Sequence, residues 1–149
     1  MMPSEAEEPE AALPDAAASI AGRRLLVAED NELNREIAVY LLKEAGAMVD
    51  QAADGKEAVE MFAASAPGTY DAVLMDVMMP VRDGHEATRA IRAMDRPDAK
   101  SIPIFAMTAN AFAEDRLKAL QAGMNEHLSK PIDPDTLYRL LVKYLTERS

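Results

Sequence analysis

Short apolar runs alternate with segments of helical hydrophobic spacing along most of the chain. The apolar runs predict strands at 25–28, 47–52, 70–75, 102–107 and 126–129. Helical spacing predicts helices at 31–45, 55–66, 87–94, 111–122 and 133–147. This alternation is typical of an α/β protein with a parallel sheet.

Glycine and proline mark several of the expected element ends. The first helix is indicated by Leu33, Ile37 and Tyr40 at helical spacing and stops at Gly46. Pro97 is expected just beyond the end of the third helix, because proline is common shortly after a helix. The pattern therefore predicts five strands and five helices in alternation.

Polar side chains follow four of the five predicted strands. Glu29 and Asp30 follow the first strand, Asp76 the third, Thr108 the fourth and Lys130 the fifth. Right-handed crossovers leave the carboxyl ends of parallel strands on one side of the sheet. We therefore expect these side chains to meet in the crevice where α/β proteins bind ligands.

The first 22 residues differ in composition from the rest of the chain. They are rich in Ala, Glu and Pro, and they carry five acidic residues without any Lys or Arg. Such a segment has too little apolar surface to fold alone, so 1–22 is expected to be a flexible acidic tail or linker. Residues 23–147 are expected to form one domain.

Charge and composition exclude several classes of function. The net charge of −10 becomes −5 once the five acids of 1–22 are set aside, and no basic stripe is present. Direct nucleic-acid binding is therefore disfavoured. The chain has no cysteine, no secretory signal and no apolar run of about 18 residues, so a soluble cytoplasmic protein without membrane contact is expected.

The converging carboxylates indicate a metal site. Glu29, Asp30 and Asp76 would repel one another, so without a cation at least one pKa should rise. A ligand set of hard oxygen atoms, with no Cys or His nearby in sequence, favours Mg²⁺ or Mn²⁺ over zinc.

A metal beside a carboxylate, a lysine and a hydroxyl suits phosphoryl transfer. In this hypothesis Asp76 is the nucleophile and forms an acyl phosphate. Asp30 binds the metal, and Glu29 binds it directly or holds a metal-bound water. Lys130 neutralises phosphoryl oxygens, and the Thr108 hydroxyl bonds to one of them after phosphorylation. By itself, Asp76 could equally be a residue that begins a turn.

Four short segments resemble the receiver domain of two-component response regulators. They are LVAEDN at 26–31, LMDVMMP at 74–80, MTA at 107–109 and SKP at 129–131. The segments occur in the family's order and spacing and span almost all of 23–146. The resemblance implies a flavodoxin-like, doubly wound fold with five parallel strands in the order 2-1-3-4-5.

The resemblance also implies a mechanism. A partner phosphohistidine would donate to Asp76, with Mg²⁺ bound by Asp30, Asp76 and the backbone carbonyl of Met78. The peptide bond before Pro131 would be cis. As Thr108 moves toward the phosphoryl group, the helix at 111–122, its flanking strands and the last helix would shift. The domain would phosphorylate and slowly dephosphorylate itself, without turning over an external substrate.

Three positions near the site bear on signalling and lifetime. His127 stands where the family usually has an aromatic switch residue, and we expect it to occupy that position. Met78 and Asn110 stand at the two positions that tune hydrolysis in the family. Because the Met78 side chain cannot orient water by hydrogen bonding, a long-lived phosphoryl group is expected.

The wider context leaves alternatives open. The segments around Glu29 and Thr108 resemble receivers of hybrid histidine kinases, which favours that origin over a stand-alone regulator. A histidine kinase or a histidine phosphotransfer protein is then the expected partner. A haloacid-dehalogenase-like phosphatase would carry Asp-x-Asp at its first strand, whereas Met78 lies two residues after Asp76. An FMN-binding flavodoxin would need a Ser/Thr/Gly-rich loop after the first strand, and a binding-only pseudo-receiver would not need the intact site.

Overall fold

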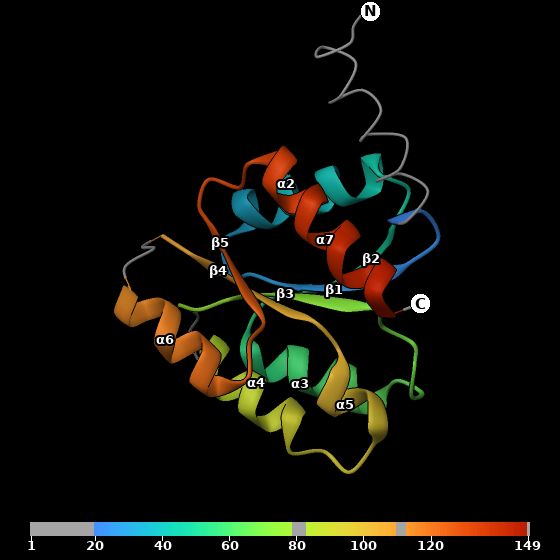
Figure 1. Cartoon of the computed structure of the whole chain (residues 1–149), viewed down its shortest axis with the longest axis vertical. Coiled ribbons are helices and arrows are strands. Elements are labelled where there is room, and N and C mark those ends of the chain that lie inside the picture. The colour runs from blue at the N-terminus through green and yellow to red at the C-terminus, as the bar shows by residue number, and fades with distance from the viewer. Residues whose placement is uncertain (1–19, 79–82, 110–112, 149) are drawn as a thin grey trace, which may run out of the picture.

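A five-stranded parallel sheet forms the centre of the molecule (Figure 1). The computed structural model describes residues 20–78, 83–109 and 113–148. The strands are β1 (Arg24–Ala28), β2 (Met48–Ala52), β3 (Ala72–Asp76), β4 (Ile104–Thr108) and β5 (Glu126–Ser129). They lie in the order β2-β1-β3-β4-β5, which confirms the predicted fold class and strand order.

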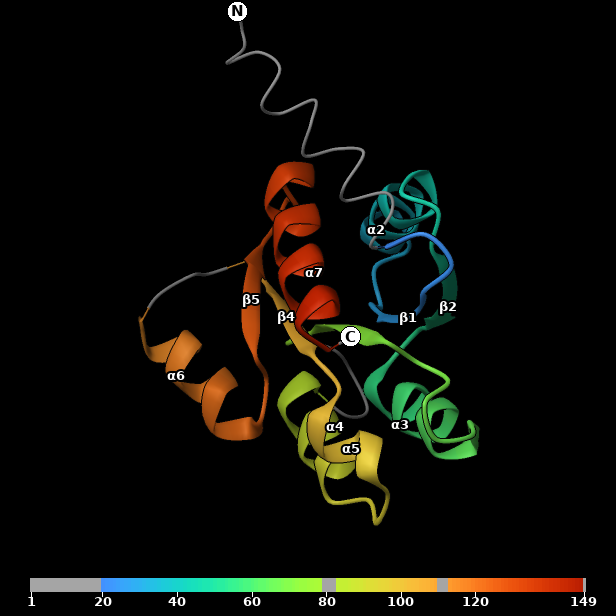
Figure 2. The same cartoon turned by 45° about the vertical axis from the view of Figure 1, so that its right-hand side comes forward.

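Helices cover both faces of this sheet (Figures 1 and 2). One face carries α2 (Glu32–Glu44) and α7 (Pro134–Arg148). The other face carries α3 (Gly55–Ala64), α4 (Gly84–Arg92), α5 (Pro97–Ser101) and α6 (Ala113–Ala122). Because every crossover passes through a helix, all carboxyl ends of the strands lie on one edge.

Two hydrophobic cores result from side chains that alternate along the strands. In β1, Leu25 and Val27 pack toward α2 and α7, whereas Leu26 and Ala28 pack toward the opposite helix layer. All four side chains are buried, so β1 is a fully covered strand of the kind that a continuous apolar run indicates.

Short polar side chains begin four of the described helices. The side chains of Asn31, Asp54, Asp83 and Asp133 each accept a hydrogen bond from the backbone N–H three residues later, at 2.8 to 3.0 Å. Each satisfies a helix N–H that would otherwise lack a partner. The starts of α2, α3 and α4, all at the functional edge of the sheet, are thereby fixed.

Two boundaries differ from the sequence predictions. Pro97 does not simply follow a helix; it begins the short helix α5, since proline suits the first helical position, where no N–H is needed. Ile20 is fully buried in the core beneath α2 and α7, and the Gly22 amide donates to the Gly46 carbonyl. The buried side chain of Ile20 therefore lies three residues before the predicted boundary at residue 23.

The outer faces of α2 and α6 are unusually apolar. Leu33, Ile37 and Tyr40 on α2 are 65%, 41% and 62% exposed, and Leu117 and Leu120 on α6 are similarly exposed. The core contacts of α2 come instead from Ala38, Val39 and Leu42. The periodicity that indicated this helix thus belongs largely to a solvent-facing stripe.

A half-buried arginine, Arg92, connects α4 to the end of α6. The guanidinium of Arg92 donates to the Gly123 carbonyl at 2.8 and 3.0 Å, to the Asn125 side chain at 2.9 Å and to the Ala99 carbonyl at 3.1 Å. Burial lowers the pKa of Arg92. Asn125 also accepts from the Ile104 amide, which ties this cluster to the start of β4.

Candidate functional site

The carboxyl ends of four strands bring the predicted site residues together. Glu29 and Asp30 follow β1, Asp76 is the last residue of β3, Thr108 is the last residue of β4, and Lys130 follows β5. The side-chain oxygens of the three acidic residues lie within 4.8 Å of one another. The convergence expected from parallel strand order is therefore present.

Lys130 bridges the two buried carboxylates. Its Nζ atom lies 2.9 Å from Glu29 Oε1 and 3.0 Å from Asp76 Oδ1. Glu29 and Asp76 are only 1% and 2% exposed, whereas Asp30 is open to solvent. The peptide bond between Lys130 and Pro131 is cis, as the family resemblance implied.

Burial perturbs the pKa of Asp76 most strongly. It raises the pKa from 3.8 to about 7, helped by the neighbouring Glu29 carboxyl and opposed by Lys130. Burial also lowers the pKa of Lys130, but its ion pairs with Glu29 and Asp76 outweigh this and leave the pKa raised. The expected pKa rise among the carboxylates is thus found at Asp76.

The donor set fits a hard divalent cation. Among the residues that the structure describes, the converging ligands are oxygen atoms from two buried carboxylates and one exposed carboxylate. Glu29 Oε1 is buried and accepts no hydrogen bond of good geometry, although Lys130 lies nearby. A cation that takes oxygen ligands and keeps several waters, such as Mg²⁺, would satisfy that atom and lower the mutual repulsion.

Hydrogen bonds hold the backbone amide, the backbone carbonyl and the carboxylate of Glu29. Its amide donates to the Ala52 carbonyl at 3.1 Å, and its Oε2 atom accepts from the Asn31 amide at 3.1 Å. Its carbonyl accepts from the Arg35 guanidinium at 2.8 Å, and Arg35 also donates to the Gln51 side chain at 3.2 Å. The turn after β1 is therefore anchored to both β2 and α2.

Gly84 allows α4 to approach the end of β3. A Cβ atom at this position would lie 2.2 Å from the Asp76 carbonyl oxygen, and the Gly84 amide donates to the Val77 carbonyl at 3.0 Å. No side chain fits in this space without moving the backbone at Asp76. The position of the buried carboxylate depends on this glycine.

The remaining predicted positions lie around this centre. The Met78 amide donates weakly to Asp76 Oδ1 at 3.3 Å, and its side chain is 76% exposed. Thr108 is buried at the end of β4, and its carbonyl accepts from the Lys130 amide at 2.8 Å. His127 is half-buried in β5, where it pairs with Ala106. Asn110 lies outside the described residues.

A family model described as the response regulator receiver domain matches residues 25–142. The chain belongs to the receiver domain family. It is 38% identical over 131 residues to hybrid signal transduction histidine kinase I of Dictyostelium discoideum, a match that covers 84% of the chain. The chain spans only 7 to 8% of the length of the Dictyostelium kinases that it matches.

Solved receiver domains share both the fold and much of the sequence. The receiver domain of a sensor histidine kinase from Pseudomonas aeruginosa, crystallised with magnesium coordinated in its active-site cleft, is 41% identical. Its TM-score is 0.76, and the match covers 85% of the present chain and 99% of that one.

A second solved structure shows a receiver domain together with a phosphotransfer protein. The receiver domain of Ssk1, from its complex with the histidine phosphotransfer protein Ypd1 of Saccharomyces cerevisiae, is 26% identical with a TM-score of 0.75. The match covers 86% of the present chain and 92% of that one.

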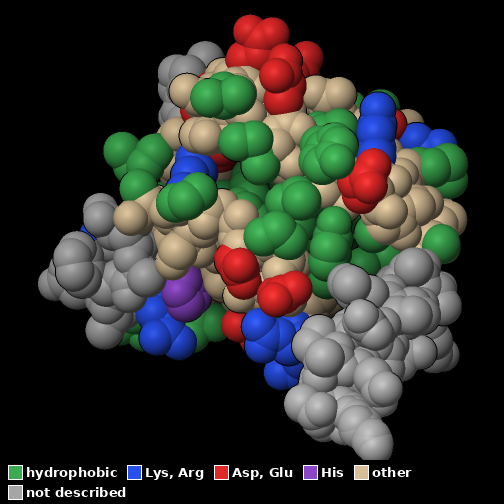
Figure 3. Space-filling view, turned by 90° about the horizontal axis from the view of Figure 1, so that it is seen from above, with side chains coloured by type: hydrophobic (Ala, Val, Ile, Leu, Met, Phe, Trp, Pro, Cys, Tyr) green, Lys and Arg blue, Asp and Glu red, His purple; other side chains and the backbone are tan. Residues whose placement is uncertain are grey.

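A shallow groove opens beside the centre of this receiver domain. It is lined by Glu29, Asn34, Ile37, Lys130, Pro131 and Ile132. It joins Lys130 and Glu29 to Ile37 of the apolar stripe on α2. Figure 3 shows hydrophobic side chains gathered on the face formed by α2 and α7. Within the described residues, no helix has the length and apolar character needed to span a membrane.

Two residues of the site were not predicted from the sequence. Arg35 lies six residues after Glu29 and contacts a carbonyl oxygen, so no charged partner indicated its role. Gly84 follows Asp83 in a dipeptide typical of turns, and the close approach to Asp76 appears only in the fold. The one sequence signal for a role of Arg35 in the site was its position on the first turns of the helix that follows Glu29 and Asp30.

Proposed function

We propose that this receiver domain accepts a phosphoryl group on Asp76 within a two-component phosphorelay. The observation that carries the proposal is the contact of Lys130 with Asp76 at 3.0 Å, beside two further carboxylates. A cation and a lysine on either side of a buried carboxylate can neutralise the oxygens of a transferring phosphoryl group. A lysine that served only as a structural ion pair would not require Asp30.

In the proposed step, an Asp76 carboxylate oxygen attacks the phosphorus of a phosphohistidine. The new P–O bond forms as the P–N bond breaks, and the imidazole leaves as a neutral ring when its other nitrogen carries a proton. Lys130 neutralises a phosphoryl oxygen. Thr108, at the neighbouring strand end, hydrogen-bonds to another oxygen once the acyl phosphate has formed.

Glu29, Asp30, Asp76 and the Met78 carbonyl would hold Mg²⁺, or Mn²⁺ in its place. The bound cation supplies charge neutralisation for the acidic cluster and the phosphoryl oxygens. Asp76 must be ionised to attack, and its pKa near 7 without a cation leaves it partly protonated at neutral pH. Cation binding and ionisation of Asp76 therefore favour each other.

The donor is a protein that presents its phosphohistidine against α2. Leu33, Ile37 and Tyr40 form an exposed apolar stripe, and Ile37 continues into the groove that leads to Lys130. Exposed apolar surface next to a reactive group is typical of a docking site. The Ypd1 and Ssk1 complex supports a histidine phosphotransfer protein as this donor or acceptor, and a histidine kinase is the other partner class.

Phosphorylation of Asp76 would change the surface that α6, β5 and α7 form. Movement of Thr108 toward the phosphoryl group shifts the equilibrium between two conformations of α6, β5 and α7. His127 would occupy the switch position. The similarity to hybrid kinases supports an origin in such a protein, located in the cytoplasm, over a stand-alone regulator.

Labelling with a small phosphodonor tests the proposal. The native chain should incorporate one phosphoryl group from phosphoramidate in the presence of Mg²⁺, and Asp76→Asn should incorporate none. Chelation with EDTA should abolish labelling. Undiminished labelling of Asp76→Asn would refute the central assignment.

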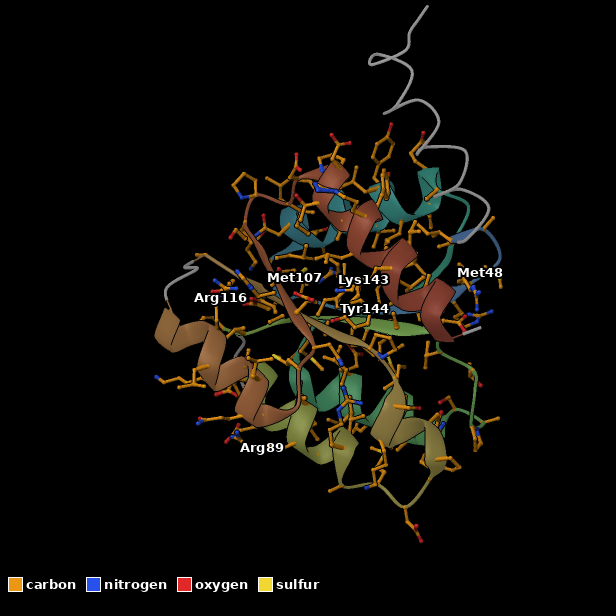
Figure 4. The ribbon with its side chains drawn as sticks, in the orientation of Figure 1. Met48, Arg89, Met107, Arg116, Lys143 and Tyr144 are labelled. Atoms are coloured by element: carbon orange, nitrogen blue, oxygen red, sulfur yellow. The ribbon has the colours of Figure 1, made fainter. Side chains whose placement is uncertain are left out.

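Two matched substitutions test the docking surface. Ile37→Glu should slow phosphotransfer from a phosphohistidine protein at least tenfold and leave phosphoramidate labelling unchanged, because an acid replaces an apolar contact outside the reacting atoms. Met48→Glu is the control, since Met48 is exposed to a similar degree, 46% against 41%, and lies on the edge strand β2 (Figure 4). Equal effects of both substitutions would reject the α2 stripe as the docking site.

A further inference from the structure

Arg35 is the one residue that joins α2, the acidic turn and the edge strand through a single side chain within the described residues. Its Nη1 donates to the Glu29 carbonyl at 2.8 Å, and its Nε donates to Gln51 Oε1 at 3.2 Å. The two acceptors belong to the turn after β1 and to β2. The guanidinium therefore bridges two segments that are also joined by the backbone hydrogen bond from Glu29 to Ala52.

The Glu29 carbonyl belongs to the peptide unit that leads into Asp30. Fixing this carbonyl fixes the plane of the peptide and so limits the directions that Asp30 can take. Asp30 is exposed, whereas the Glu29 carboxylate is buried and is held by the Asn31 amide and Lys130. Arg35 thus acts where the exposed candidate ligand joins the chain.

The charge of Arg35 alone would act in the opposite direction. A positive charge near the acidic cluster repels a divalent cation, so an arginine kept at this place weakens cation binding unless it also orders the ligands. The two effects have opposite signs. Their balance can be measured directly.

We infer that Arg35 is a positioning residue that orients the Glu29–Asp30 peptide for divalent cation binding, with Gln51 holding the guanidinium in place. The inference rests on the metal site of the proposed function. Partners that orient metal ligands typically contribute about 10- to 100-fold to metal affinity. Because Arg35 holds a carbonyl rather than a ligand atom, its contribution belongs at the lower end of this range.

Calorimetric titration of Mg²⁺ into the full chain tests the inference. Arg35→Met removes both donors and should weaken Mg²⁺ binding about tenfold. Arg35→Lys keeps the charge but cannot reach both acceptors, and it should weaken binding by a similar factor. Arg89→Met is the control, because Arg89 is exposed on α4 in the helix layer across the sheet, as Figure 4 shows.

Gln51→Met removes only the support for the guanidinium, so it should weaken binding by a smaller factor of about three. The Arg35→Met/Gln51→Met double variant should bind no more weakly than Arg35→Met, because both act through the same guanidinium. Labelling by phosphoramidate supplies the second measurement. In Arg35→Met the Mg²⁺ concentration for half-maximal rate should rise about tenfold, while the rate at saturating Mg²⁺ stays within about twofold.

Each outcome separates the possible explanations. Mg²⁺ binding that tightens in Arg35→Met would overturn the inference, because the charge of Arg35 would then be its main effect on the site. Unchanged Mg²⁺ binding would overturn it as well, because no net positioning effect would remain. A lower maximal rate with unchanged Mg²⁺ dependence would overturn it as well. If the native chain binds no Mg²⁺, the proposed function fails instead. Thermal unfolding without Mg²⁺ verifies that each variant is folded, and Gln51→Met tests the inference if Arg35→Met is not.

Discussion

Replacing Asp76 with asparagine should stabilise the protein when no divalent cation is present. The native state holds Asp76 at a pKa of about 7 rather than 3.8, so it binds a proton more tightly than the unfolded chain. Stability should therefore fall as pH rises from about 4 to about 7. At about 1.4 kcal/mol per pH unit, ionising Asp76 in the fold destabilises it by about 4 kcal/mol above pH 7.

Asparagine removes this charge without changing the size of the side chain. Its amide oxygen can still accept from Lys130, and its NH₂ group can donate to Glu29. Lys130 loses one of its two anionic partners, which offsets part of the gain. We expect a net stabilisation of about 2 kcal/mol at pH 8, or about 6 °C in Tm for a domain of this size.

Urea denaturation in EDTA at pH 8 and at pH 4 measures both parts of this prediction. The difference between native and Asp76→Asn should be close to zero at pH 4, where the native carboxyl is already protonated. Addition of 10 mM Mg²⁺ at pH 8 should stabilise the native chain and have little effect on the variant. A variant that is less stable than the native chain at pH 8 in EDTA would refute the reasoning.

Four other predictions concern single positions. Arg96 donates hydrogen bonds to Asp98 at 2.7 and 2.8 Å and lowers the pKa of Asp98 to about 2. Asp98→Asn should therefore lower the free energy of unfolding by about 2 kcal/mol at pH 7. Unfolding curves measured in acid should show this difference disappear as the pH falls from 3.8 towards 2. Gly84→Ala should lower urea stability by about 1 to 3 kcal/mol, because its Cβ would overlap a backbone carbonyl; unchanged stability would mean that α4 shifts freely. Met78→Glu should shorten the phosphoryl lifetime, measured by loss of label after donor removal, since a carboxylate can orient water; loss within seconds from the native chain would contradict its expected long lifetime. His127→Tyr should increase the change in partner affinity produced by a phosphoryl mimic such as beryllofluoride, and an unchanged ratio would reject a switch role.

The sequence predicted the parts of this molecule that depend on pattern and chain order. The strand order was implied by the resemblance to receiver domains. The alternation of strands and helices and the meeting of Glu29, Asp76 and Lys130 follow from parallel strands whose ends lie on one edge. These features need only the position of each residue relative to a strand end. Precise side-chain geometry is not required to foresee them.

Other features depended on contacts between distant segments. The periodicity of α2 could not show which apolar face packs inward, because Ala38 and Leu42 form the core side while Leu33 and Tyr40 face solvent. A helix that binds a partner and a helix that binds its own sheet have similar apolar patterns. The role of Arg35 could not be predicted for another reason. Its hydrogen-bond acceptors are an uncharged backbone carbonyl and an uncharged side-chain amide, which a search of the sequence for charged partners does not find.

The hydrogen bonds of Arg92 to Gly123 and Asn125 fix the C-terminal end of α6, so a rotation of this helix would displace mainly its N-terminal end. The helix of 10 residues is about 15 Å long, so a rotation of about 10° around its pinned C-terminal end displaces the other end by about 2.6 Å. Displacement then grows along the helix toward the end nearest Thr108. If phosphorylation rotates α6 in this receiver domain, the backbone of its first turn would therefore move most and the backbone at Gly123 least.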